Sequence, residues 1–222
     1  MSTLKIAIDG PAGAGKSSIA KAVAAKLGIV YIDTGAMYRA IGLAALRRGI
    51  DPKNADAVTA ILPEIDITIS HDSDGQRIFL CGDDVSDEIR TPEVSVAASD
   101  VAVCAAVREK LLELQRGLAE KSDVIMDGRD IGTHVLPNAD IKIFLTASVE
   151  ERAMRRYREL KEKGTECSFE EVKRDMEYRD RNDSERAIAP LREAEDSVRV
   201  DTTGNSLDES VEKILCVIKE RR

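Results

Sequence analysis

The residues with the clearest chemical meaning lie near the N-terminus, between a short apolar segment and an amphipathic stretch. They fit the pattern G-x-x-x-x-G-K-[ST] and, with the serine that follows, are Gly10, Pro11, Ala12, Gly13, Ala14, Gly15, Lys16, Ser17 and Ser18. Glycines let a backbone wrap a phosphate where a Cβ would collide with it. Lys16 then supplies a positive charge to β- and γ-phosphates, and Ser17 a hydroxyl ligand for Mg²⁺. We call residues 10–18 the phosphate-binding loop.

The segments on either side of this loop supply the strand and the helix that such a loop needs. Residues 4–9 are typical of a buried strand, and the apolar residues Ile19, Ala20, Val23 and Leu27 have helical spacing, which predicts a helix over 16–27. The start of that helix offers free N–H groups and a positive dipole end to an anion. The alternative, a glycine-rich turn that binds nothing, is disfavoured by the Lys-Ser ending and by these flanking elements.

Two further polar segments follow apolar strands. The segment 33–39 comes after a strand over 29–32; Thr34 is expected to cap the next helix, and Arg39, one turn into it, to reach a second phosphate. The segment 127–130, Asp-Gly-Arg-Asp, follows a strand over 124–126. Asp127 at that place resembles a Walker B carboxylate, which holds Mg²⁺ through water. The alternative for this segment is a tight turn with a local Asp–Arg ion pair.

Arginine is abundant between residues 152 and 192, with acids interleaved. Most of these charges are expected on a solvated helix surface with i,i+4 pairs. A guanidinium binds phosphate oxygens through two hydrogen bonds, and phosphoryl transfer needs cations that neutralise the transferring group. The candidates are Arg152, Arg155 and Arg156, expected to reach the phosphates only after closure and to lie far from the phosphate-binding loop otherwise. The loop over 161–167 separates two helices and predicts a lid at about 156–168.

The remaining sequence alternates between strands and helices, which predicts an α/β fold with a three-layer arrangement around a parallel sheet. Further strands are predicted at 141–145 and 198–200; further helices are predicted at 36–48, 54–62 and 92–120, and from residues 148, 168 and 206. Alternating isoleucines, a turn at 71–75, a return strand at 77–80 and a possible third strand within 83–90 predict an antiparallel β insertion over 63–91. The core then comprises 1–62 and 92–222. Ligands of parallel sheets bind at the carboxyl ends of the strands, so the polar segments described above should meet there.

The composition disfavours several classes of function. The chain of 222 residues has a net charge of −8, 3% aromatic residues and no tryptophan, which argues against nucleic acid as a partner. No apolar run is long enough for a membrane helix. Four widely spaced cysteines and two distant histidines argue against a zinc site and a Ser-His-Asp triad, and predict reduced thiols in a cytoplasmic protein. An acidic surface poor in apolar residues favours a monomer.

Taken together, these motifs resemble the bacterial cytidylate kinase family. The resemblance covers essentially the whole chain and rests on five segments, namely 9–16, 33–39, 84–90, 127–133 and 186–191. It implies a P-loop kinase core, with the β insertion as the monophosphate-binding part and a helical lid. It also implies transfer of the γ-phosphoryl group of ATP to CMP or dCMP, giving ADP and CDP or dCDP with Mg²⁺, in pyrimidine nucleotide metabolism.

The resemblance also implies roles for individual residues. The positions similar to cytosine readers are Ser99, Arg108 and Asp130, and those similar to ligands of the acceptor phosphate are Arg39, Arg129 and Arg186. Arg179 and Asp183 fall where the family holds the sugar, and Thr34 and Tyr38 line the same pocket. Lys16 and Arg129 join the lid arginines as catalytic cations, and Ser17 and Asp127 hold the metal.

Two other functions remain to be distinguished. A small P-loop kinase acting on shikimate, gluconate or another monophosphate would share the phosphate-binding loop and the lid, but would have no need for the trio Ser99, Arg108 and Asp130. A nucleotide-dependent switch such as a GTPase usually carries the guanine-reading motif N-K-x-D, and this sequence has none.

Overall fold

A five-stranded parallel sheet forms the centre of the protein in the computed structural model, which describes residues 3–72 and 75–221. The strand order is β2-β6-β1-β7-β8. The strands are β1 (Lys5–Asp9), β2 (Val30–Asp33), β6 (Val124–Gly128), β7 (Ile141–Thr146) and β8 (Val198–Asp201). All adjacent strands are parallel, so the segments that follow them emerge at one edge of the sheet. The predicted α/β class is therefore confirmed.

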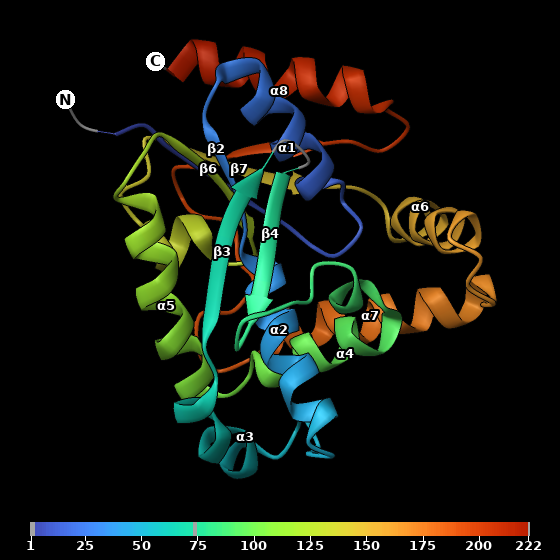
Figure 1. The fold of residues 1–222 in the computed structure, drawn as a ribbon. Helices are drawn as coiled ribbons and strands as arrows, with labels where there is room; N and C mark the ends of the chain where they lie inside the picture. Colours follow the sequence, from blue (N-terminus) through green and yellow to red (C-terminus); the bar gives the residue numbers. More distant parts are fainter. Residues whose placement is uncertain (1–2, 73–74, 222) are drawn as a thin grey trace.

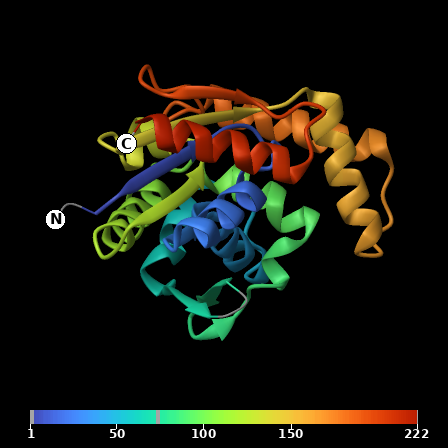
Figure 2. The ribbon, with the colours of Figure 1, turned by 90° about the horizontal axis from the view of Figure 1, so that it is seen from above.

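Helices cover both faces of this sheet (Figures 1 and 2). On one face, Ile6 and Ile8 of β1 pack with α1 (Lys16–Leu27) and α8 (Leu207–Arg221). On the other face, Ala7 packs with α2 (Thr34–Arg47) and α5 (Ala105–Ala119). Successive residues of a strand point to opposite faces, and both faces of β1 are apolar because both are covered. The three predicted layers are thus present.

The predicted insertion is an antiparallel sheet of three strands. Its strands are β3 (Ile67–Asp72), β4 (Gly75–Leu80) and β5 (Asp83–Asp84); α3 (Ala55–Ile61) and a short 3₁₀ turn (Leu62–Glu64) precede them, and a second 3₁₀ turn (Glu88–Arg90) follows them. The third strand is only two residues long, far shorter than the 83–90 stretch in which it was expected. Residues 73 and 74 of the predicted turn lie outside the described residues. Buried Ile67, Ile78 and Leu80 join the same apolar cluster as α2, so the insertion is packed on the core.

The single long helix predicted over 92–120 is wrong. The structure has two helices, α4 (Pro92–Val101) and α5, separated by a turn in which Cys104 is extended. Nine residues at 100° each would place Ser99 and Arg108 on opposite faces of one continuous helix. The break instead lets Ser99 donate to Asp183 and Arg108 donate to Asp130, so tertiary packing overrides an uninterrupted helical pattern.

Two helices after β7 form the arm in which the lid was predicted (Figure 1). They are α6 (Val149–Glu162) and α7 (Phe169–Glu185). Ser168 and Glu171 form the predicted capping box, whereas at the start of α6 only Ser148 caps, because Glu151 binds Arg155 instead. The two helices share a small apolar cluster that includes Leu160 and Met176.

Two smaller observations complete the fold. All four cysteines are free thiols, as the sequence predicted. Within residues 3–72 and 75–221, no helix combines the length and the apolar character needed to cross a membrane.

Candidate active site

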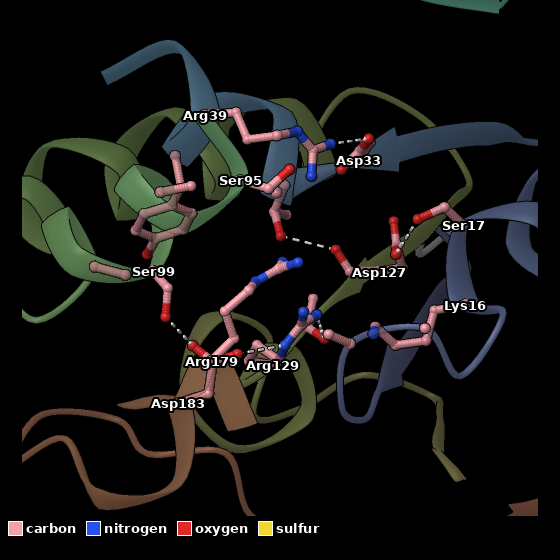
Figure 3. A pocket seen from close by; sticks show the side chains of 18 of the residues that line it. Lys16, Ser17, Asp33, Arg39, Ser95, Ser99, Asp127, Arg129, Arg179 and Asp183 are labelled. Carbon is pink, nitrogen blue, oxygen red and sulfur yellow. Dashed lines mark hydrogen bonds and ion pairs between the residues drawn. The ribbon is translucent and has the colours of Figure 1, made fainter. Parts of the chain in front are cut away.

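A cavity of about 530 Å³ opens at the carboxyl ends of the central strands. The phosphate-binding loop, Asp33 and the turn 127–130 all line it, together with parts of α4, α6 and α7 (Figure 3). The sequence placed these segments together only because parallel strands end at one edge, and the structure bears this out. Of the residues expected to contact substrate, the cavity is lined by Thr34, Tyr38, Arg39, Ser99, Arg129, Asp130, Arg179, Asp183 and Arg186.

The glycines of the phosphate-binding loop are needed for packing as well as for phosphate. Gly10 has a φ of +148°, and a Cβ there would lie 1.9 Å from the carbonyl oxygen of Leu145 in β7. Gly13 has a φ of +73°, and its Cβ would lie 2.6 Å from the Cε of Met176 in α7. Position 10 therefore requires glycine before any ligand is considered, and at position 13 the left-handed backbone favours it.

Lys16 lies buried over its own loop. Its Nζ donates to the carbonyl oxygen of Pro11 at 2.8 Å, and only 5% of the residue is exposed. Burial, followed by the charge of Arg129, lowers the pKa of Lys16 to about 7 despite the nearby acids. This ammonium pairs with a neutral carbonyl and sits where the helix start would hold a triphosphate.

This environment predicts proton uptake when the donor nucleotide binds. A bound triphosphate restores negative charge beside Lys16 and raises its pKa from about 7 towards the ordinary value of 10.5. At pH 8 most of the unliganded protein then lacks this proton, so binding of MgATP should take up ~1 proton. The number of protons taken up is measured by titration calorimetry of MgATP binding in buffers that differ in ionisation enthalpy. The Lys16→Met variant should lose the uptake; equal uptake by both proteins would contradict this reading of Lys16.

The residues expected to hold Mg²⁺ are adjacent. The Ser17 hydroxyl donates to Asp127 at 2.9 Å, and the Tyr31 hydroxyl donates to the other carboxylate oxygen at 2.9 Å. Burial, then the charge of Asp33, raises the pKa of Asp127. No ion pair involves Asp127 in the described ranges, and Arg129 pairs with Asp183 instead, so the alternative of a local Asp–Arg turn is wrong.

The chemistry of these donors fits a magnesium ion. Mg²⁺ prefers oxygen ligands and keeps several waters, using one or two carboxylates together with substrate phosphates. A serine hydroxyl beside a buried carboxylate without a cationic partner is such a set. Within the described part of the chain there is no group of three histidine, cysteine or acidic side chains that could hold a metal alone, and this site requires none.

Thr34 does not have the capping role predicted for it. The side chain of Asp33 caps α2 by accepting from the backbone N–H of Ala36 at 3.0 Å. The Thr34 hydroxyl donates instead to the carbonyl oxygen of Asp127 at 2.7 Å, which ties α2 to the end of β6. The helix begins two residues earlier than predicted because Asp33, at the end of β2, supplies the cap.

Arg108 and Asp130 form a buried ion pair beside the cavity. The guanidinium of Arg108 donates to one oxygen of Asp130, and that of Arg186 donates to the other at 3.2 Å. Arg108 is 4% exposed and does not itself line the cavity, yet its Nε and Nη1 have no hydrogen-bond partner. Buried donors are rarely left unpaired, so these two nitrogens are available to a polar ligand. Its guanidinium carbon also lies 5.8 Å from the centre of the Tyr38 ring.

Ser99, the third residue predicted to contact cytosine, is hydrogen-bonded to Asp183 and not to Asp130. The Ser99 hydroxyl donates to Asp183 at 3.3 Å, and Arg129 donates to the second oxygen of Asp183 at 2.8 Å (Figure 3). Among the described residues, no hydrogen bond joins Ser99 to Arg108 or Asp130. The structure therefore divides the predicted trio into a pair beside Tyr38 and a serine on the α7 side of the cavity.

The arginines expected at the acceptor phosphate are held by carboxylates. Arg39 donates to Asp33 at 2.8 Å, and Arg90 donates to the same oxygen at 3.2 Å. Although burial opposes it, these two arginines hold the pKa of Asp33 below its usual value. Arg90 lines the cavity and was missed in the sequence, where only its place at the end of the segment 84–90 could have pointed to it. Arg186 lies with Asp130, apart from Arg39.

Arg179 lies between these groups. Its side chain points into the cavity near Arg129 (Figure 3). Burial and then the charge of Arg129, with smaller effects from Arg39 and Arg156, lower the pKa of Arg179 to about 10. Several cations that oppose one another's charge favour an anionic ligand between them.

The expectation that the three lid arginines lie far from the phosphate-binding loop is wrong for Arg152 and Arg155. Arg152 is buried and donates to the carbonyl oxygen of Ala12 at 2.8 Å and to Asp180 at 2.7 Å. Arg155 donates to the carbonyl oxygen of Thr202 at 2.6 Å and lines the cavity. The physical reason is that α6 begins just beyond β7, next to the loop, so its first turns cannot be remote. Arg156 also lines the cavity and pairs with Glu159 at 2.7 Å.

Comparison with known proteins decides the family. The sequence profile of the family described as Cytidylate kinase matches residues 6–220. The chain is 52% identical over 215 residues to a cytidylate kinase of Caldicellulosiruptor bescii, covering 97% of this chain and 95% of that protein. It is 51% identical over 220 residues to a cytidylate kinase of Bacillus licheniformis, covering 98% and 97%. This chain belongs to the cytidylate kinase family.

A structural comparison adds support for the fold alone. An uncharacterized protein from Eubacterium ventriosum has a similar structure, with a TM-score of 0.53 and 12% sequence identity, covering 98% of this chain and 99% of that one.

As a member of the cytidylate kinase family the chain is an enzyme, a nucleoside monophosphate kinase. The sequence resemblance stated above is thereby confirmed.

Proposed function

We propose that this kinase transfers the γ-phosphoryl group of ATP to CMP or dCMP with Mg²⁺, giving ADP and CDP or dCDP. The observation that carries the proposal is the buried pair Arg108–Asp130, which adjoins the cavity that begins at the phosphate-binding loop. A kinase of a non-nucleotide acceptor has no use for such a pair. The product would serve pyrimidine nucleotide metabolism.

The pair matches the hydrogen-bonding edge of cytosine. Cytosine presents an exocyclic N4 donor beside the N3 and O2 acceptors, so a carboxylate and a guanidinium complement it. The unpartnered Nε and Nη1 of Arg108 would donate to the base, and Asp130 would accept from N4. Uracil reverses the polarity at positions 3 and 4 and would leave buried groups unpaired, which lowers its kcat/KM by orders of magnitude.

The acceptor phosphate would replace two carboxylates as the partner of Arg39 and Arg129. Arg39 and Arg129 now hold Asp33 and Asp183, and an incoming phosphate offers them more negative charge. Arg179 and Asp183 would hold the sugar, and Arg186, kept in place by Asp130, would complete the pocket. These residues bind and orient the acceptor so that its phosphate oxygen faces the γ-phosphate.

The donor side would be held by the phosphate-binding loop. Its backbone N–H groups and Lys16 bind the β- and γ-phosphates, and Arg155 and Arg156 line the side towards the arm of α6 and α7. Ser17 and Asp127 would hold the Mg²⁺, which neutralises phosphate charge when bound. Arg152 would support this arrangement by fixing Ala12 of the loop. Closure of the β insertion and of the arm over both nucleotides would exclude water from the transfer.

The proposal extends to the partners, the location and the oligomeric state of the protein. We propose that it is a cytoplasmic monomer whose partners are small nucleotides alone. Nucleic acid and membrane are not among its partners. The acidic net charge and the four free thiols support this setting.

Transfer itself is tested with ATP labelled in the γ-phosphate. Incubation with CMP should place the label in the β-phosphate of CDP and release one ADP for each CDP formed. Label found only as inorganic phosphate would contradict the proposal.

A further inference from the structure

A buried carboxylate outside the cavity joins α4 to α7. Asp100 of α4 is 8% exposed, and one of its oxygens accepts from the Tyr178 hydroxyl at 2.6 Å and from the Asn182 side-chain amide at 3.1 Å. The Lys53 ammonium lies 5.2 Å from the centre of the Tyr178 ring and adds positive charge beside the carboxylate. None of these residues lines the cavity. We call Asp100, Tyr178 and Asn182 the α4–α7 anchor.

Each member of the anchor is the sequence neighbour of a residue that lines the cavity. Asp100 follows Ser99, Tyr178 precedes Arg179, and Asn182 precedes Asp183. Residues four apart share a face of a helix, so Tyr178 and Asn182 form one row of α7 while Arg179 and Asp183 form the next. On the cavity side, Ser99 donates to Asp183 at 3.3 Å. The two helices are therefore joined by two parallel sets of hydrogen bonds, one in the cavity and one behind it.

The first half of α7 packs against α6. Val172 and Met176 pack with Ala153 and Leu160 of α6, in the arm where the lid was predicted. One helix thus passes from the arm into the acceptor pocket, and movement of the arm would be carried into that pocket. Hydrogen bonds to a buried carboxylate are strong and directional, so the anchor opposes such movement.

We propose that the α4–α7 anchor positions the second half of α7 so that Arg179 and Asp183 are ready to bind the acceptor nucleotide. Its members are positioning residues, because they act through their neighbours and do not touch the nucleotide. The inference rests on the proposed contact of Arg179 and Asp183 with the acceptor. It follows that the anchor sets the affinity for CMP even when no donor nucleotide is present.

The test compares two variants that break the anchor with one that keeps its acceptor oxygen. Tyr178→Phe retains the ring over which Lys53 lies but removes the hydroxyl, and Asp100→Leu removes the acceptor. Loss of a hydrogen bond to a charged group should weaken CMP binding about tenfold, measured by calorimetry without ATP, and raise the KM for CMP similarly. The KM for MgATP and the kcat should stay within about twofold. Asp100→Asn keeps an oxygen that can accept from both partners but loses the charge, and should weaken CMP binding less than Asp100→Leu does.

The outcomes separate this inference from the proposed function. Asp183→Asn serves as the reference, since it alters a side chain proposed to touch the acceptor. Weaker CMP binding in Asp183→Asn but not in Tyr178→Phe would overturn the anchor alone. Unchanged CMP binding in Asp183→Asn would overturn the proposed sugar contact, and the anchor with it. A rise of both KM values together with a fall in kcat in Tyr178→Phe would show a general structural role and also overturn the anchor.

Discussion

Lys16→Ala is expected to lower kcat by at least ~100-fold, because the transition state loses a fixed positive charge beside the transferring phosphoryl group. The loss should appear in kcat and not only in the KM for MgATP, since the charge on the transferring group is what the ammonium stabilises. Steady-state rates of ADP formation at saturating CMP measure it.

The same helix offers a matched control for this variant. Lys26 of α1 is half exposed and pairs with Glu212 on the surface, away from the cavity. Lys26→Ala should leave kcat within about twofold, because exposed ion pairs contribute little. Circular dichroism and the midpoint of thermal unfolding show whether Lys16→Ala remains folded. Near-normal turnover by a folded Lys16→Ala protein would refute the proposed use of the phosphate-binding loop.

The second large effect concerns base recognition. Asp130→Ala and Arg108→Ala should each reduce kcat/KM for CMP by ~5- to 150-fold, because each removes a partner worth ~1–3 kcal/mol from a desolvated base edge. The KM for MgATP at saturating CMP should change much less. Steady-state kinetics with one substrate varied at a time separates the two effects.

Removal of one member of a buried ion pair also threatens the fold, so this prediction needs controls. Asp130→Asn keeps the shape and one acceptor for Arg108 and Arg186, and should be the most stable variant of the set. Arg199→Ala breaks an exposed ion pair with Glu193 and should alter neither kinetic constant. Equal losses towards CMP and MgATP in Asp130→Asn would mean that the pair supports the fold and does not read the base.

The central fold was predictable because its signals are local. The apolar strands, the glycine-rich loop and the capping serines each lie within a few adjacent residues. The convergence of Ser17 and Asp127 followed from one topological rule, that parallel strands present their carboxyl ends together, although 110 residues separate the two.

The features that were missed depend on contacts between distant segments. The break between α4 and α5 contains neither glycine nor proline, and its consequence appears only in contacts with distant acids, where Ser99 reaches Asp183 and Arg108 reaches Asp130. Gln76 of β4 joins the insertion to the core: its side-chain amide accepts from the backbone N–H of Asp33 at 2.9 Å and donates to the backbone carbonyl oxygen of Asp33 at 3.2 Å. The residues next to Gln76 in the sequence do not predict these hydrogen bonds. Arg90 is a similar case, since its role appears only once Asp33 and Arg39 lie beside it.

The contacts of Asp9 are a further feature that the sequence does not predict. Its carboxylate accepts from the backbone N–H groups of Ile131 and Gly132, both at 2.7 Å, and so holds the turn that carries Asp130. Burial raises the pKa of Asp9 to about 7. The sequence places Asp9 beside the phosphate-binding loop but gives no sign that it also supports the acceptor side, 121 positions away at Asp130.

A comparison of acceptors tests the central claim most directly. It measures kcat/KM for CMP, dCMP, UMP, AMP and shikimate with saturating MgATP in one coupled assay of ADP formation. The structure predicts that CMP and dCMP exceed each of the other three by at least ~100-fold. Uracil reverses the polarity that Arg108 and Asp130 read, adenine is a larger purine without the O2 acceptor, and shikimate has no base. A value for UMP, AMP or shikimate that equals or exceeds the value for CMP would contradict the account.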